Sequence, residues 1–411
     1  IMLKSLILIF FILFPFYLKA QEKNLDYFIN QAKTNSPLLN DYQNQLLILS
    51  LDSSKLRAGL KPQVNASSNL LYAPIIRGIG FDPAITNGQI VSALVTVSKQ
   101  ITTKDRLNTL LKSLQLNRDS LGNQRAFTVL DLERGVSAQY ITTWGDQQIV
   151  QLAKETLQLL EKQDTLLKKL TQGSVFKQTE YLAFKVNLEQ QYLTLMQSQN
   201  QYKNDFAALN YLSGIADTTS YAISSPPVRV INVPKFTESL LFKKYQIDSL
   251  KTLNALDQLS LNYKPKLNVF ADGGYQSSLP QQAYKNFGWS VGLNLSIPIY
   301  DGGLRKLTTQ QINLNQRTQN KYRDFYKIQY DQQKNQFQRM IDQYESSINK
   351  AKKQLNYSKT LIDANALQMK TGDVRMTDYL ISINNYLNLR VNIIQNKINQ
   401  LQMINQLQYL K

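Results

Sequence analysis

The chain has neither cysteine nor histidine among its 411 residues. The absence of cysteine excludes disulfide bonds, thiolate metal sites and a lipid-modified N-terminal cysteine. The absence of histidine removes the commonest metal ligand and the usual proton shuttle of catalysis. Carboxylates are scattered singly and no nucleophile has a candidate base, so we expect no enzyme, no metal site and no cofactor. The turn Asp301-Gly302-Gly303 also lacks the Lys-Ser or GxGxxG continuation of a phosphate-binding loop.

Long apolar runs are scarce as well. One stands near the N-terminal end, where Lys4, the apolar residues 6–18 and the small Ala20 predict a signal peptide over residues 1–20, cleaved before Gln21. No other run reaches the roughly 18 apolar residues that suggest a transmembrane helix, so the mature chain is expected to be exported whole. The formal net charge is +18, but the basic residues are spread among Gln and Asn without aromatic clusters, which argues against nucleic acid as a partner.

Strict alternation of apolar and small polar residues marks the segment 286–299. The odd positions are apolar, and the even positions up to Ser296 are small or polar. This pattern predicts a strand with lipid on one face and water on the other, with Phe287, Trp289 and Tyr300 as membrane-interface aromatics. A single strand of this kind more often covers a soluble core, but its neighbours favour the membrane.

Three other segments show the same alternation. The strands predicted over 64–72 and 91–98 form one hairpin, and 267–276 forms a second hairpin with the segment just described. Tyr72 and Tyr275 stand at strand ends and complete the expected set of interface aromatics.

Long helices occupy most of the remaining chain. They are predicted over 25–60, 104–170 (as one helix or two in line), 179–212, 236–262, 304–369 and a last segment that reaches the C-terminal end. Apolar residues that repeat every seven positions predict helices packed against one another, as in a coiled coil: Leu152, Leu159 and Leu166, then Leu380, Leu387, Ile394 and Leu401.

The pattern of elements occurs twice. Equivalent prolines, strand-end serines and turn glycines lie 203, 198 and 199 residues apart: Pro62 and Pro265, Ser98 and Ser296, Gly173 and Gly372. We therefore divide the chain into a first repeat, 21–216, a connector, 217–235, and a second repeat, 236–411. Each repeat consists of a helix, a β-hairpin and a long helical hairpin, so the predicted fold class is mixed α and β.

Four strands per chain cannot close into a barrel, and lipid does not tolerate open sheet edges. Chains must therefore pool their strands. Two chains would give eight strands around a filled interior, whereas three give twelve, and the small polar residues of the inner face suit a wetted lumen. The pattern favours three or more chains around a conduit.

The chain resembles the TolC family of trimeric outer-membrane efflux and secretion channels. The resemblance rests on the duplicated layout and on two segments: 293–305, Leu-Asn-Leu-Ser-Ile-Pro-Ile-Tyr-Asp-Gly-Gly-Leu-Arg, and 370–380, Lys-Thr-Gly-Asp-Val-Arg-Met-Thr-Asp-Tyr-Leu. The first repeat diverges more, with Lys99-Gln100 in place of Ile-Pro. The resemblance implies a homotrimer with a 12-stranded β-barrel in the outer membrane of a Gram-negative bacterium and an α-barrel in the periplasm.

The resemblance further implies a passive exit duct of a tripartite efflux pump or a type I secretion system. Such a duct docks onto a periplasmic membrane-fusion adaptor and an inner-membrane pump of the RND, ABC or MFS type. The alternative is an exported periplasmic coiled-coil adaptor or scaffold. It would share the signal peptide and the heptads but would lack four two-faced strands.

Two helical turns are the candidate docking tips: Gly173 with Val175, and Gly372 with Val374. A turn between antiparallel helices needs a residue that tolerates positive φ, which explains each glycine. We expect adaptor docking at these turns.

The resemblance places a pore-lining acid of the closed constriction at Asp378, six residues after Gly372. Glu180 is its weaker counterpart in the first repeat. In the family a second acid usually follows three residues later, where this chain has Ile381, so a single ring of carboxylates is implied. The other interpretation of Asp378 is a solvated acid on the outside of the helices.

Overall fold

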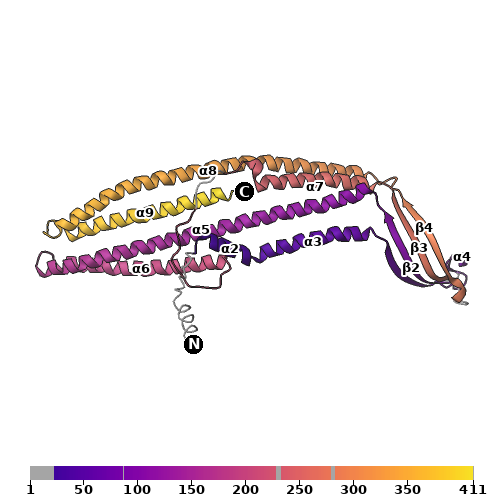
Figure 1. Ribbon diagram of the computed structural model, residues 1–411, viewed down its shortest axis with the longest axis horizontal. Helices are drawn as coiled ribbons and strands as arrows, with labels where there is room; N and C mark the ends of the chain where they lie inside the picture. Colours follow the sequence, from indigo (N-terminus) through magenta and orange to yellow (C-terminus); the bar gives the residue numbers. More distant parts are fainter. Residues whose placement is uncertain (1–22, 87, 228–232, 279–282, 411) are drawn as a thin grey trace, which may run out of the picture. The chain divides into compact units, whose positions relative to one another are not determined.

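The computed structural model describes residues 23–86, 88–227, 233–278 and 283–410 (Figure 1). The predicted signal peptide, 1–20, lies outside the described residues. The first part of the chain contains α2 (Leu25–Asn35), α3 (Pro37–Gly59), β1 (Gln63–Tyr72), α4 (Pro83–Thr86), β2 (Gln89–Ile101), α5 (Lys104–Gln172) and α6 (Gln178–Leu212). The second part contains η1 (Phe236–Glu238), α7 (Leu240–Asn262), β3 (Lys266–Ser277), η2 (Ala283–Asn286), β4 (Phe287–Ser296), α8 (Leu304–Gln368) and α9 (Met376–Gln408).

The mixed α and β fold class is confirmed, and so is the doubled order of elements. The series α3, β1, β2, α5, α6 recurs as α7, β3, β4, α8, α9. One helix prediction is wrong: the stretch 25–60 is two helices. Ser36 has extended backbone between them, because Pro37 disfavours helical backbone in the residue before it.

Helix α5 is continuous over 69 residues despite three internal glycines, which settles the choice between one helix and two in line. At ~1.5 Å per residue it is about 100 Å long. Gly145 has a packing reason, because a Cβ there would overlap the side chain of Ile398 from α9. A Cβ at Gly122 or Gly135 would meet no atom within 4 Å, so neither glycine is explained by packing within the chain.

The four strands form one antiparallel sheet in the order β1-β2-β3-β4. Both predicted hairpins are present, and β2 pairs with β3 to join them. β4 ends at Ser296, the strand-end serine of the repeat alignment, although the apolar alternation continues to Ile299, because Lys266 pairs with Ser296 and the preceding Pro265 begins no further ladder. Tyr300 therefore lies outside the strand.

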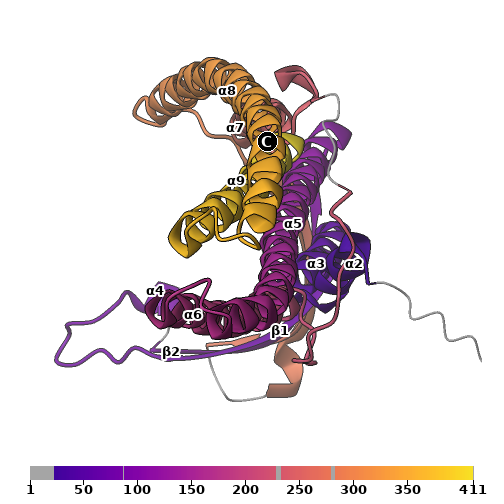
Figure 2. The same ribbon diagram turned by 90° about the vertical axis from the view of Figure 1, so that its left-hand side faces the viewer.

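Contacts divide the chain into two compact units. Unit 1 comprises Ile1–Pro37, Thr128–Val233 and Tyr330–Lys411, and unit 2 comprises Leu38–Phe127 and Pro234–Gln329. Each unit takes segments from both predicted repeats, and the boundaries of those repeats remain a prediction from the sequence. Unit 1 holds the turns between the long helices, which Figure 2 shows from their side, and unit 2 holds the sheet.

Candidate functional site

The turn between α5 and α6 ends its helix with a left-handed residue. The N–H of Ser174 donates to the C=O of Thr171 at 3.0 Å, and the N–H of Val175 donates to the C=O of Leu170 at 2.9 Å. In this arrangement, the Schellman motif, the residue after the C-cap takes positive φ. That residue is Ser174, with φ at 61°, so the prediction that Gly173 supplies the positive φ is wrong. The reason is that α5 extends to Gln172 and leaves Gly173 as the cap itself.

The turn between α8 and α9 has the same backbone. The N–H of Gly372 donates to the C=O of Met369 at 3.3 Å, and the N–H of Asp373 donates to the C=O of Gln368 at 3.1 Å. Gly372 has φ at 81°, so here the predicted glycine does occupy the left-handed position.

The shared motif sets the alignment of the two repeats. It pairs Ser174 with Gly372, an offset of 198 that equals the offset at the strand ends. The alignment superposes Thr-Glu-Tyr-Leu, 179–182, on Thr-Asp-Tyr-Leu, 377–380, so Glu180 and Asp378 are equivalent without an inserted residue. The same alignment separates Val175 from Val374, which were predicted to be equivalent.

One hydrophobic cluster lies beneath both turns. Its buried members come from both helical hairpins: Leu157, Leu160, Leu167, Phe176, Phe184 and Leu188, with Ile362, Met369, Met376, Tyr379 and Ile383. The turns also contact each other, since a Cβ on Gly372 would lie 3.1 Å from Cγ1 of Val175. Val175 is otherwise exposed, and Val374 is half-buried. The two turns therefore form a single tip in unit 1 over a shared apolar cluster, a contact that the sequence did not predict.

The two equivalent acids are in different surroundings. The carboxylate of Glu180 accepts the N–H of Lys177 at 3.0 Å and so caps the first turn of α6. Asp378 lies in the first turn of α9, is exposed, and donates its own N–H to the C=O of Arg375 at 3.1 Å. Within the described ranges, no side chain is recorded as bonded to the Asp378 carboxylate. Of the two candidates, Asp378 is the acid whose carboxylate has no bonded partner among the described residues.

The sheet in unit 2 separates its side chains by chemistry as predicted. The strand register places the apolar positions of all four strands on one face, in rows such as Val64, Val97, Ala271 and Val291. On β4 this face is exposed, and Trp289 retains 83% of its accessible surface. Such an apolar face needs cover from lipid or from another protein.

The opposite face of the sheet carries mostly small and polar side chains, with Leu94 and Phe270 as apolar exceptions. One row contains Asn65, Thr96, Asp272 and Ser290. The Asp272 carboxylate accepts hydrogen bonds from the hydroxyls of Thr96 and Ser290, the latter at 3.3 Å. The sequence analysis gave Asp272 no special role, although an acid in the interior of a strand is unusual enough to have been a signal.

The aromatic residues expected at a membrane interface differ in exposure. Tyr72, Phe287 and Trp289 are exposed on strands. Tyr275 is half-buried because its ring packs against Phe287, with ring centroids 6.1 Å apart. Tyr300 is exposed but lies beyond the end of β4, so it does not mark the other end of a strand as predicted.

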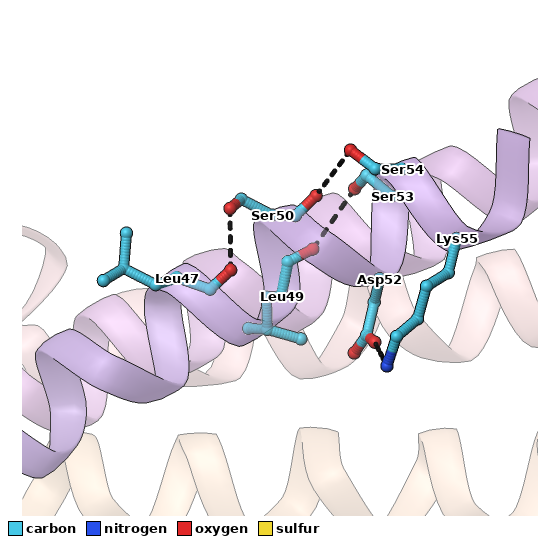
Figure 3. Close-up of polar contacts among 7 residues, drawn as sticks. All are labelled: Leu47, Leu49, Ser50, Asp52, Ser53, Ser54 and Lys55. Atoms are coloured by element: carbon cyan, nitrogen blue, oxygen red, sulfur yellow. Dashed lines mark hydrogen bonds and ion pairs between the residues drawn. The ribbon is translucent and has the colours of Figure 1, made fainter. Parts of the chain in front are cut away.

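Helix α3 carries a further apolar surface. Its serines bond back to the helix itself: the hydroxyl of Ser50 donates to the C=O of Leu47 at 2.7 Å, and that of Ser53 donates to the C=O of Leu49 at 3.3 Å (Figure 3). Leu47, Ile48 and Leu51 remain more than half exposed. Among the described residues, nothing covers these apolar side chains.

The described residues offer neither a membrane-spanning helix nor a metal site. In the part of the chain that the structure describes, no helix has both the length and the apolar character needed to cross a bilayer. The same residues hold no group of three or more acidic side chains placed to bind a metal ion.

Comparison with solved structures identifies the fold. The CusC structure, reported for its transmembrane channel formation, has a TM-score of 0.77 at 12% identity, over 95% of this chain and 92% of that chain. The outer membrane protein VceC from Vibrio cholerae has a TM-score of 0.74 at 12% identity, over 93% and 94%. The Campylobacter jejuni CmeC outer membrane channel has a TM-score of 0.73 at 13% identity, over 94% and 85%. No protein-family model and no curated protein matches the chain. The chain therefore has the fold of these outer-membrane channels, as its resemblance to the TolC family implied.

Proposed function

We propose that this protein is an outer-membrane channel, the passive exit duct of a tripartite efflux pump or a type I secretion system in a Gram-negative bacterium. The observation that carries the proposal is the sheet: one face is apolar and exposed, the other is polar, and β1 and β4 are unpaired edges. A strand of about 10 residues is long enough to cross a bilayer when tilted, and β1 and β4 have 10 residues each. The fold shared with solved outer-membrane channels supports the same conclusion.

The protein acts as a homotrimer in this proposal. Open strand edges in lipid leave backbone N–H and C=O groups without partners, at several kcal/mol for each group. Three copies of the four-stranded sheet give twelve strands, and β4 of each copy closes onto β1 of the next. The exposed Leu47, Ile48 and Leu51 of α3 supply apolar surface for contact between copies.

The tip formed by the two turns docks onto the periplasmic adaptor, which connects the channel to an inner-membrane pump of the RND, ABC or MFS type. Val175 supports this assignment because it is exposed at the point where the two turns meet. The chemistry of the tip does not distinguish among the three pump classes.

The gate of the closed channel is a ring of three Asp378 side chains in this proposal. The support is that Asp378 is exposed and unbonded at the start of α9, whereas Glu180 is occupied as a helix cap. Like charges in a narrow ring attract cations into the constriction.

The alternative, a periplasmic coiled-coil adaptor, does not account for the sheet. An adaptor has no use for four strands whose apolar face is exposed to solvent. Extraction of membranes with carbonate separates the two, because an adaptor washes off and a barrel remains.

Planar bilayers test the proposed function. The purified protein should form channels, and the Asp378→Asn variant should keep assembly but lose cation selectivity and sensitivity to divalent cations. Glu180→Gln serves as the matched control and should leave both properties unchanged. A protein that forms no channels contradicts the duct, whereas unchanged selectivity in Asp378→Asn contradicts only the gate.

A further inference from the structure

A hollow of about 220 Å³ lies on the polar face of the sheet, above a pair of glycines. Its lining includes Gly274 and Gly288, which pair across β3 and β4. Asp272 and Ser290 lie at one end, in the next row of the sheet, and Gln276 and Asn286 lie at the other. A carboxylate thus faces two amides across the two glycines, and Leu94 of β2, which pairs with Gly274, adds an apolar side to the hollow.

The glycine at Gly288 is not explained by the fold. Its φ is not in the left-handed region, and a Cβ there would meet no atom within 4 Å. Gly292, two residues on, is explained, because the ring of Phe270 fills the space where its Cβ would be. A glycine within a strand costs stability and often marks a place where a ligand approaches the backbone. The hollow stays open because Gly288 has no side chain.

The described residues of this face supply no counterion for Asp272. None of the ion pairs among the described residues includes Asp272. Lys266, the other charged residue of β3 on this face, is six residues away, or ~20 Å at ~3.3 Å per residue. Lys99 of β2 pairs with Val269 and so lies on the apolar face. The hydroxyls of Thr96 and Ser290 hold the carboxylate in place without neutralising it.

The donor set selects an organic cation over a metal ion. Calcium and magnesium sites use several oxygen ligands, commonly with more than one carboxylate, and the hollow has a single carboxylate. The hollow is also too large for one ion. The four residues from Asp272 to Gln276 extend ~13 Å at ~3.3 Å per residue. An extended four-carbon diamine with a hydrogen bond at each end has about this length.

We propose that the hollow between Asp272 and Gln276 is a binding site for a small primary ammonium compound inside the channel. One ammonium group pairs with the Asp272 carboxylate, and the far end of the ligand bonds to the side-chain oxygens of Gln276 and Asn286. Three copies of the chain carry three such sites. The assignment rests on the proposed channel, because it takes the polar face as the face that meets water.

Calorimetric titration of the detergent-purified protein with putrescine tests the site. The wild type should bind putrescine and should not bind 1,4-butanediol, which has the same chain length without charge. The Asp272→Asn variant, which is isosteric, should bind putrescine at least about tenfold more weakly, since a charged hydrogen bond is lost. Equal binding by wild type and Asp272→Asn overturns the proposal.

A pair of glycine variants separates filling of the hollow from damage to the sheet. Gly288→Val should abolish binding because its side chain occupies the hollow. Gly273→Val is the matched control: a Cβ at Gly273 also meets no atom within 4 Å, but Gly273 lies on the apolar face. Binding that survives in Gly288→Val, or that disappears equally in Gly273→Val, contradicts the assignment.

Conductance of the same preparations distinguishes the site from the channel. A protein that conducts in planar bilayers but does not bind putrescine overturns the site and leaves the duct standing. A protein that binds putrescine through Asp272 but does not conduct overturns the duct and leaves the site.

Discussion

The two turns between the long helices have the same backbone and different side chains. Both end their first helix with a Schellman motif, and both begin the next helix with Thr, an acid, Tyr and Leu. In the first turn a serine takes the left-handed position and the acid caps the helix. In the second turn a glycine takes that position and the acid is unbonded. The two turns thus share their backbone geometry, and among the described residues the acid of the second turn has no bonded partner.

Substitution of the equivalent tyrosines, Tyr181 and Tyr379, should give the largest difference in stability between the turns. Tyr379 is fully buried in the cluster beneath the tip, whereas Tyr181 is half-buried. Tyr379→Ala should lower the free energy of unfolding by about 3–5 kcal/mol, and Tyr181→Ala by less than half of that, since less buried surface is lost. Denaturant unfolding of both variants measures this, and equal losses would contradict the difference in packing.

The hydroxyl of Tyr379 allows a control on the same side chain. It is buried without a hydrogen-bond partner among the described atoms, and burial raises the pKa of Tyr379 to about 12. Tyr379→Phe keeps the ring and should therefore leave stability unchanged or slightly raise it.

Substitution of the two residues with positive φ should change the stability of the protein in opposite directions. Gly372→Ala places a Cβ at positive φ and close to Val175, which should cost about 1–2 kcal/mol. Ser174→Gly removes the same strain in the first turn and should stabilise the protein, or leave it unchanged where the extra freedom of the unfolded chain offsets the relief. Thermal unfolding of the two variants measures both effects. If Ser174→Gly destabilised the protein more than Gly372→Ala does, the two turns would not be equivalent.

A pair of carboxyl groups in the first repeat, without a counterpart in the second, should make the stability of the protein depend on pH. Asp146 of α5 shares a hydrogen bond with Asp205 of α6. Burial and then this hydrogen bond raise the pKa of Asp146 to about 7. Burial acts to raise the pKa of Asp205 as well, but hydrogen bonds from Asp146, Gln201 and Gln139 lower it overall. The offset of 198 leads to Tyr344 and Met403 in the second repeat, which cannot form such a pair.

The sign of this effect follows from the raised pKa. Between pH 3.8 and about pH 7 folded Asp146 holds a proton that the unfolded chain releases, so stability falls as pH rises through this window. Asp146→Asn should be more stable than the wild type at pH 8, by about 1–2 kcal/mol after allowance for solvent at a half-buried group. The difference should vanish near pH 4. A variant less stable than the wild type at pH 8 would contradict the shared proton.

The helix caps give the smallest expected difference. Glu180→Ala removes the bond to the N–H of Lys177 and should cost about 0.5–1 kcal/mol. Asp378→Ala removes no recorded bond and should cost only a few tenths of a kcal/mol from the helix dipole. High salt should reduce the stability loss of Asp378→Ala but not that of Glu180→Ala in unfolding measurements. A larger loss for Asp378→Ala than for Glu180→Ala would mean that the Asp378 carboxylate has a partner.

Much of this fold was predictable because its signals are periodic. Alternation located all four strands and assigned their faces, and heptads and breakers located the helices to within a few residues. Alternation alone does not give the end of β4, because a strand ends where its partner ends, and pairing with Lys266 is not visible in the local sequence. The first turn was misassigned because glycine usually supplies positive φ, and here a serine does. The hollow beside Asp272 depends on which residues pair across strands, so it could not be read from one strand alone.

Whether β4 of one copy pairs with β1 of the next tests the central proposal most directly. The chain has no cysteine, so Asn294→Cys on β4 can be combined in turn with Gln63→Cys, Asn65→Cys or Ser67→Cys on β1. Two strands stand between these edges within one sheet, which is too far for an internal disulfide. After oxidation of outer membranes, denaturing electrophoresis should show covalent trimers for at least one pair and none for the single variants. Monomers in every pairing, or a ladder that continues beyond three chains, would contradict a closed trimeric barrel.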